Sequence, residues 1–240
     1  MVPLHRLFRS LAAAAVVLLF LVITAPLAHA QQLITYFNFN DQNETSEVPP
    51  GMQSSTITQV NLTPSFVTGT TVNQYPSPSP PDNPNFALRL TFPNNGGGNL
   101  KALQFTVSTV GLTNLSLSYA TQSSVAVSQT LSYSTDGGTT FTNAGPPKPT
   151  STTFTTLSFN NLTGAENQAS VIFRITISAA GGNHSQTVDF DNIQLNGSEV
   201  PEPATVVGGL LGALGLCWHQ RRRLLGIAQL LRFSRQPAAV

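Results

Sequence analysis

The sequence predicts an all-β fold, an antiparallel β-sandwich, placed between two terminal targeting segments. Short runs of alternating apolar and polar residues recur through residues 31–199, and turn-forming residues separate them. No stretch of this segment shows the 3.6-residue apolar period of an amphipathic helix. Because the runs follow one another at hairpin-like spacing, we expect antiparallel strands arranged in two packed sheets.

About nine strands are expected from these runs. The clearest of these runs is Phe86–Phe92. It has apolar side chains on one face and Arg89 and Thr91 on the other. The expected strands are Leu33–Phe39, Phe86–Phe92, Leu103–Val107, Leu112–Tyr119, Gln129–Tyr133, Thr140–Thr142, Phe154–Phe159, Val171–Ser178 and Thr187–Leu195. The proline-dense segment 72–85 cannot join a central strand, so we expect a long surface loop there.

Residues 1–30 have the pattern of a secretory signal peptide. A basic start is followed by the apolar run Leu11–Ile23 and by an A-x-A motif formed by Ala28 and Ala30, after which signal peptidase would cut. The alternative is an uncleaved membrane anchor. The small-residue motif at the right distance from the apolar run favours cleavage.

Charge and cysteine content limit what residues 31–199 can do. This segment has four basic and nine acidic residues, a formal net charge of −5. Without a basic patch to neutralise phosphates, nucleic-acid binding is excluded. The only cysteine, Cys217, lies outside the segment, so its stability must come from packing, hydrogen bonds or a metal.

The chain ends in a tail with three parts. The motif Pro201-Glu202-Pro203 holds the chain extended, and the apolar stretch Ala204–Trp218 that follows has fifteen residues. That length is below the ~20 residues that comfortably span a bilayer. Three arginines then act as a stop-transfer signal on the cytoplasmic side, and these are Arg221, Arg222 and Arg223.

This order of motif, apolar stretch and arginines resembles the PEP-CTERM sorting domain of Gram-negative bacteria, over about 24 residues from Val200 to Arg223. The resemblance implies transient anchoring in the inner membrane through a single apolar helix. Cleavage by an exosortase near the Pro-Glu-Pro motif would then release the domain to the cell envelope or the outside. On this resemblance the motif is recognised by the processing enzyme and is not catalytic. Proteins of this family typically accompany exopolysaccharide production.

Two alternatives remain for the tail. An ordinary single-pass anchor would also have an apolar stretch followed by arginines. The tails of the family usually stop near the arginines, whereas this one continues through Leu224–Val240. The extension is either a basic amphipathic helix on the inner leaflet or a remnant discarded after processing.

Ser134–Phe141 (STDGGTTF) is similar to the Asp-box of sialidase propellers. A propeller enzyme would need such a box in several blades, and this sequence has one, which favours a hairpin within the sandwich. Asp136 is expected to accept backbone N–H bonds across the turn, and Phe141 to anchor the hairpin on the core.

The last expected strand, Thr187–Leu195, resembles the closing strand of jelly-roll carbohydrate-binding and lectin-like modules, which pairs with the first strand. With Val188 and Phe190 turned to the core, its aspartates would face outward or to the sheet edge. They would then offer oxygen ligands to a structural calcium ion that bridges the first and last strands. The hypothetical ligands are Asp189, Asp191, Asn192 and Asp41. The alternative is two solvated aspartates that discourage edge-to-edge aggregation.

Three functions follow from these features. The first is a non-enzymatic surface or matrix component. The second is a carbohydrate-binding module, for which Tyr75 is the first residue to test, although the domain has no tryptophan. The third is a glycoside hydrolase with paired carboxylates, for which the candidates are Asp189 and Asp191 on the last strand and Asp41, Glu44 and Glu47 after the first. His184 is the only histidine of the domain and no G-x-S-x-G motif accompanies it, so a serine triad is unsupported.

Overall fold

The computed structural model describes residues 31–46, 53–75, 84–92, 100–178, 186–200, 209 and 211–221. The chain divides into two compact units, Met1–Ser198 and Glu199–Val240. Several predicted features lie outside the described residues: the cleavage motif of Ala28 and Ala30, the sorting motif Pro201, Glu202 and Pro203, two of the three arginines, and residues 224–240.

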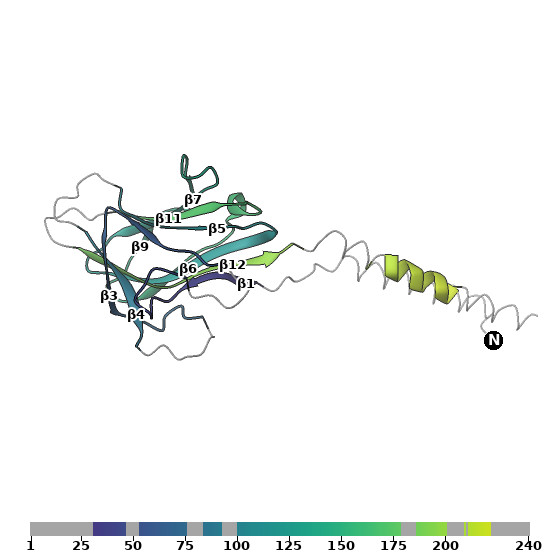
Figure 1. The fold of residues 1–240 in the computed structure, drawn as a ribbon, viewed down its shortest axis with the longest axis horizontal. Coiled ribbons are helices and arrows are strands. Elements are labelled where there is room, and N and C mark those ends of the chain that lie inside the picture. Colours follow the sequence, from purple (N-terminus) through teal and green to yellow (C-terminus); the bar gives the residue numbers. More distant parts are fainter. Residues whose placement is uncertain are drawn as a thin grey trace, which may run out of the picture. The chain divides into compact units, whose positions relative to one another are not determined.

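The first unit is a β-sandwich of two antiparallel six-stranded sheets, as the sequence predicts, and Figure 1 shows them as two layers. Sheet 1 has the order β10-β6-β12-β4-β3, with β1 also paired to β12. Sheet 2 has the order β2-β5-β11-β7-β8, with β9 also paired to β7. The strands of sheet 1 are β1 (Gln32–Phe37), β3 (Thr63–Thr68), β4 (Phe86–Thr91), β6 (Leu112–Ser123), β10 (Thr155–Phe159) and β12 (Thr187–Glu199). Those of sheet 2 are β2 (Thr58–Val60), β5 (Ala102–Val107), β7 (Ser128–Ser134), β8 (Thr142–Asn143), β9 (Lys148–Pro149) and β11 (Val171–Ser178).

The core lies between the sheets and is built by strict alternation along the strands. On β11 every second residue from Val171 to Ile177 is buried, which leaves Arg174 on the outer face. Three aromatic rings cross the interior from sheet 1 to sheet 2: Phe37 contacts Phe105 at 5.3 Å between centroids, and Phe105 contacts Phe173 at 5.4 Å. Such contacts hold the layers together by apolar burial and ring packing.

The strands that the sequence does not predict are mostly edge strands with weak patterns. β3 lies at the edge of sheet 1 and is mostly exposed. It contains Pro64, which has no backbone N–H and is tolerated in an edge strand, where an N–H can point outward without a strand partner. β2 lies at the edge of sheet 2 and has three residues. β8 begins at Thr142 rather than at Thr140.

β12 changes its partner halfway along. Residues 187–190 pair with β4, and residues 193–197 pair with β1, so the first strand does pair with the last. Val188 and Phe190 face the core as predicted, but Ile193 and Leu195 face it too. The alternation therefore slips by one residue between them. Asn192 takes up the slip with a left-handed backbone (φ 50°), a conformation that asparagine tolerates better than most residues.

In the second unit, residues 211–221 are helical, which includes Arg221 of the predicted stop-transfer signal. Of the helical segments in the described part of the chain, none has both the length and the apolar character needed to cross a membrane.

Candidate functional site

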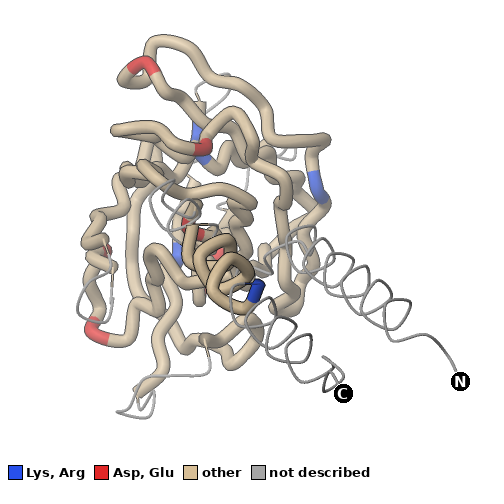
Figure 2. The backbone as a smooth tube through the Cα atoms, turned by 90° about the vertical axis from the view of Figure 1, so that its right-hand side faces the viewer, with Lys and Arg blue, Asp and Glu red and all other residues tan. Residues whose placement is uncertain are grey.

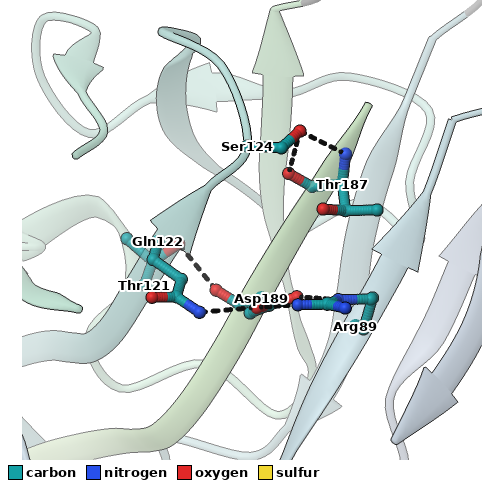
Figure 3. A network of polar contacts seen from close by, with 6 residues as sticks. All are labelled: Arg89, Thr121, Gln122, Ser124, Thr187 and Asp189. Carbon is teal, nitrogen blue, oxygen red and sulfur yellow. Dashed lines mark hydrogen bonds and ion pairs between the residues drawn. The ribbon is translucent and has the colours of Figure 1, made fainter. Parts of the chain in front are cut away.

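The predicted calcium ligands of β12 lie on sheet 1, and the structure corrects their environment. Asp189 is not a solvated side chain, because its residue is 2% exposed. Figure 3 shows why: the Arg89 guanidinium donates to both carboxylate oxygens, from Nε at 2.7 Å and Nη2 at 2.8 Å. The Gln122 amide donates to Oδ2 at 2.8 Å, and the Thr121 hydroxyl donates to the Asp189 carbonyl at 2.9 Å. The carboxylate is thus held by a bidentate ion pair and an amide.

Asp191 is also buried, and it holds the loop 69–75 onto sheet 1. Its Oδ2 accepts the backbone N–H of Thr70 at 2.7 Å, and its Oδ1 accepts the N–H of Asn192 at 2.8 Å. Gly69 sits so close to Asp191 and Asn85 that a Cβ at this position would collide with both. The alternative in which this aspartate is solvated is wrong, because Asp191 is fully buried beneath the loop.

Asn192 and its neighbours complete the attachment of the loop. The Asn192 amide donates to the carbonyls of Thr70 at 2.8 Å and Val72 at 3.0 Å, and its oxygen accepts the Tyr36 hydroxyl at 2.5 Å. Tyr75, predicted as the first aromatic to test for sugar binding, packs against Tyr36 with ring centroids 6.1 Å apart and is half-buried. The aspartates and Asn192 therefore have a structural role in sheet 1.

The four hypothetical calcium ligands have other partners. Asp41 accepts the backbone N–H and the amide of Asn43, two residues along the chain. Within the described ranges no three His, Cys, Asp or Glu side chains are grouped closely enough to hold a metal ion. The structure gives the calcium hypothesis no support, and it stays a prediction.

Sheet 2 presents a row of polar side chains on its outer face. These residues are paired directly opposite one another on five neighbouring strands. Their side chains therefore lie on the same face of the sheet. At about 4.8 Å per strand, this row is about 19 Å long. We call it the polar row, and its members are Thr58, Gln104, Arg174, Ser132 and Asn143, of which Ser132 is buried and the others are at least partly exposed.

Arg174 is the centre of the polar row, and two neighbours fix its guanidinium. The Cζ atom lies 3.2 Å from the ring centroid of Phe141, a cation–π stack. On the other side of the strand the Gln104 amide turns its oxygen toward Arg174, because in that orientation it accepts Nε at 2.5 Å and Nη2 at 2.8 Å. Nη1 has no acceptor among the described residues.

The Asp-box hairpin between β7 and β8 positions Phe141. Asp136 accepts the backbone N–H of Thr140 at 3.0 Å and its hydroxyl at 2.6 Å, and it also accepts the Ser134 hydroxyl at 2.7 Å. The hairpin and its bonds across the turn agree with the prediction. The predicted anchor is wrong, because Phe141 is partly exposed and packs on Arg174 rather than in the core.

The two arginines differ in their electrostatics. The hydrogen bonds to Asp189, and then its charge, raise the pKa of Arg89. Burial lowers the pKa of Arg174, with no carboxylate opposing the effect. The strands of sheet 2 contain two basic residues, Arg174 and Lys148, and no Asp or Glu. Figure 2 shows how sparsely the charged residues are scattered along the described chain.

Sequence reasoning singled out Arg89 only as an outward position and did not single out Arg174 or Gln104. The available signal was the sequence VIFRITIS, in which one arginine interrupts an otherwise apolar and hydroxyl-bearing strand. What it touches depends on residues about 30 and 70 positions away, and this a single strand pattern does not contain.

Comparisons with known proteins found no matching family model and no matching curated protein. Among solved structures, the chain is similar to TmCBM61 in complex with beta-1,4-galactotriose (TM-score 0.40, 9% identity, 66% of this chain and 92% of that chain). It is also similar to a family 11 carbohydrate-binding module of a cellulosomal cellulase from Clostridium thermocellum (TM-score 0.40, 11% identity, 73% and 99%). A third is an exo-beta-agarase (TM-score 0.48, 13% identity, 72% and 26%). Identities and TM-scores this low say nothing about a ligand of this chain, which has to be inferred from its own residues.

Proposed function

We propose that residues 31–199 form a non-enzymatic carbohydrate-binding domain, and that the polar row on the outer face of sheet 2 is its sugar-binding surface. The observation that supports this is the arrangement of the row itself. Amide, hydroxyl and guanidinium groups lie in line across five strands, beside the partly exposed ring of Phe141.

This chemistry suits a sugar chain. Each sugar hydroxyl is both a donor and an acceptor, and the side chains of Thr58, Gln104 and Asn143 supply both kinds of group, whereas Ser132 is buried within the row. The row is extended rather than enclosed, which fits a polymer more than a small molecule. The hydrolase alternative has no comparable support, because Asp189 and Asp191 are buried in contacts with neighbouring residues.

The test is a glycan array probed with the full-length protein, followed by titration calorimetry on any positive glycan. We expect binding to polysaccharides that is weakened at least about tenfold by Gln104→Ala, since this change removes amide contacts to ligand and releases Arg174. The matched control is Gln122→Ala, an amide on the outer face of sheet 1, which should leave sugar affinity unchanged. No binding on the array, or equal loss in both variants, would reject the proposal.

We further propose that the domain reaches its place by export and sorting. The resemblance of residues 200–223 to a PEP-CTERM tail supports this, as does the apolar surface of the tail helix. Leu211, Leu214, Leu216 and Trp218 are 63%, 52%, 69% and 60% exposed. A helix that is apolar around its circumference lacks a stable place in water and suits a lipid environment.

On this proposal signal peptidase removes residues 1–30, the tail tethers the chain to the inner membrane, and an exosortase releases the domain to the cell envelope or the outside. Mass spectrometry of the mature protein tests it directly. We expect a C-terminus near Pro201–Pro203. A surface-located protein that still carries Arg221–Arg223 would contradict the processing step.

A further inference from the structure

We infer that Arg174 is a carboxylate-binding residue, and that the polymer recognised by the polar row is an acidic polysaccharide bearing uronate groups. This inference rests on the proposed function, because it names the class of sugar that the same surface would take. The observation that supports it is a difference between the partners of the two strand arginines, Arg89 and Arg174. Arg89 has a carboxylate partner within the protein, whereas Arg174 has none among the described residues.

Arg174 is half-buried and has no counter-ion among the described residues. Removing a charge from water is costly unless an opposite charge or hydrogen bonds compensate. At Arg174 the neutral oxygen of Gln104 and the ring of Phe141 give part of that compensation. An incoming carboxylate would supply the rest, because charge-assisted hydrogen bonds are stronger than those of neutral groups.

The geometry also defines where the carboxylate would dock. Phe141 covers one side of the guanidinium, and Gln104 takes the Nε–Nη2 edge. The other edge, which carries Nη1, has no acceptor among the described residues. A carboxylate can bind Nη1 and Nη2 together there, in the bidentate manner for which arginine is suited.

The surroundings favour an anion as well. Sheet 2 has no Asp or Glu in its strands, although residues 31–199 carry a net charge of −5. Its other strand cation, Lys148, donates to the Ser158 carbonyl and lies 4.6 Å from the Phe159 ring centroid. The Asp136 carboxylate, in the hairpin that carries Phe141, is occupied by Thr140 and Ser134. Arg174 is thus the cation of this face that remains available to a ligand.

The experiment measures binding of the full-length protein to polygalacturonate, to the same polymer after its carboxyl groups have been reduced to alcohols, and to dextran sulfate. We expect binding to polygalacturonate that Arg174→Gln weakens at least about tenfold, the effect of losing charge-assisted hydrogen bonds. Arg174→Lys keeps the charge but loses the fork, so it should weaken binding to an intermediate degree. The carboxyl-reduced polymer should bind no better to the wild type than to Arg174→Gln.

The matched control is Arg89→Gln, which removes the same charge from the other sheet and should leave affinity for polygalacturonate unchanged. Circular dichroism and the melting temperature establish that each variant is folded at the temperature of the assay. Equal binding of the native and reduced polymers by wild type, lost together in Gln104→Ala, would overturn the inference while the proposed function stands. Binding to dextran sulfate alone would replace uronate by sulfate and overturn it too. Absence of binding to any glycan would remove both proposals.

Discussion

Arg89 and Arg174 occupy equivalent positions, each in the middle of a strand and each between buried apolar neighbours, but on different sheets. Arg89 meets Asp189 and forms a bidentate ion pair; Arg174 meets an aromatic ring and an amide. The pKa of the first is raised by its partner and that of the second is lowered by burial. The charge of Arg89 is thus compensated by a carboxylate within the fold. The charge of Arg174 is held in a fixed position without a carboxylate partner among the described residues. We therefore expect Arg174, which has no carboxylate partner among the described residues, to be the arginine that binds a ligand.

The largest effect is expected when Arg89 is replaced, because this removes the cation that pairs with Asp189. Arg89→Met leaves the nearly buried Asp189 carboxylate without its cation, and breaking a buried pair in this way typically costs 3–5 kcal/mol. The side chain of Arg89 is 35% exposed, so we expect a smaller loss, about 2–3 kcal/mol. The midpoint of urea unfolding measures it. A loss below about 0.5 kcal/mol would mean that the pair is no more than a surface contact.

The attachment of the loop to sheet 1 is the next largest effect. Asn192→Ala removes three side-chain hydrogen bonds and places alanine in a left-handed conformation, so we expect a loss of about 2–3 kcal/mol. Asn192→Gly is the matched variant, because it keeps the backbone relaxed and loses only the bonds. If both variants unfold at the same urea concentration, the backbone conformation contributes nothing.

Arg174 should contribute far less to stability than Arg89. For Arg174→Gln we expect a decrease of about 0.5–1 kcal/mol, the usual size of a partly exposed cation–π contact. The same unfolding assay used for Arg89→Met makes the comparison direct. A loss equal to that of Arg89→Met would show that both arginines are structural, and the two faces would no longer differ.

The smallest effect concerns the hairpin that holds Phe141. Hydrogen bonds from Thr140 and Ser134 hold the pKa of Asp136 well below its ordinary value of 3.8. Because the folded-state pKa is depressed, this stabilisation is present above pH 3.8 and is lost as the pH falls below it, toward the folded-state pKa. Unfolding curves at pH 6 and pH 3 should differ more for the wild type than for Asp136→Asn. A parallel response of both would mean that the carboxylate does not support the turn.

Much of the fold could be predicted from alternation, and the polar contacts could not. Val188 and Phe190 reach the core as their spacing predicts, because side chains of a strand alternate between its faces. Asp189 is buried by contacts with Gln122 and Arg89, and the side-chain amide of Asn192 donates to Thr70. All three partners lie more than 60 residues away in the sequence. Periodicity says which face a side chain occupies. It does not say what covers that face.

The pairing of β1 with β12 also sets an order of events for a chain that is threaded through a membrane from its N-terminus. β12 lies between β6 and β4 and receives β1 as well, so sheet 1 cannot close before Glu199 has emerged. Long-range pairing of this kind makes folding slow, since distant segments must meet. If the chain is exported and sorted as proposed, the domain reaches its final form only when Pro201-Glu202-Pro203, two residues beyond the end of β12, has arrived at the membrane. If the chain is cut near these residues, as proposed, the cleavage site becomes accessible at the time the fold is completed.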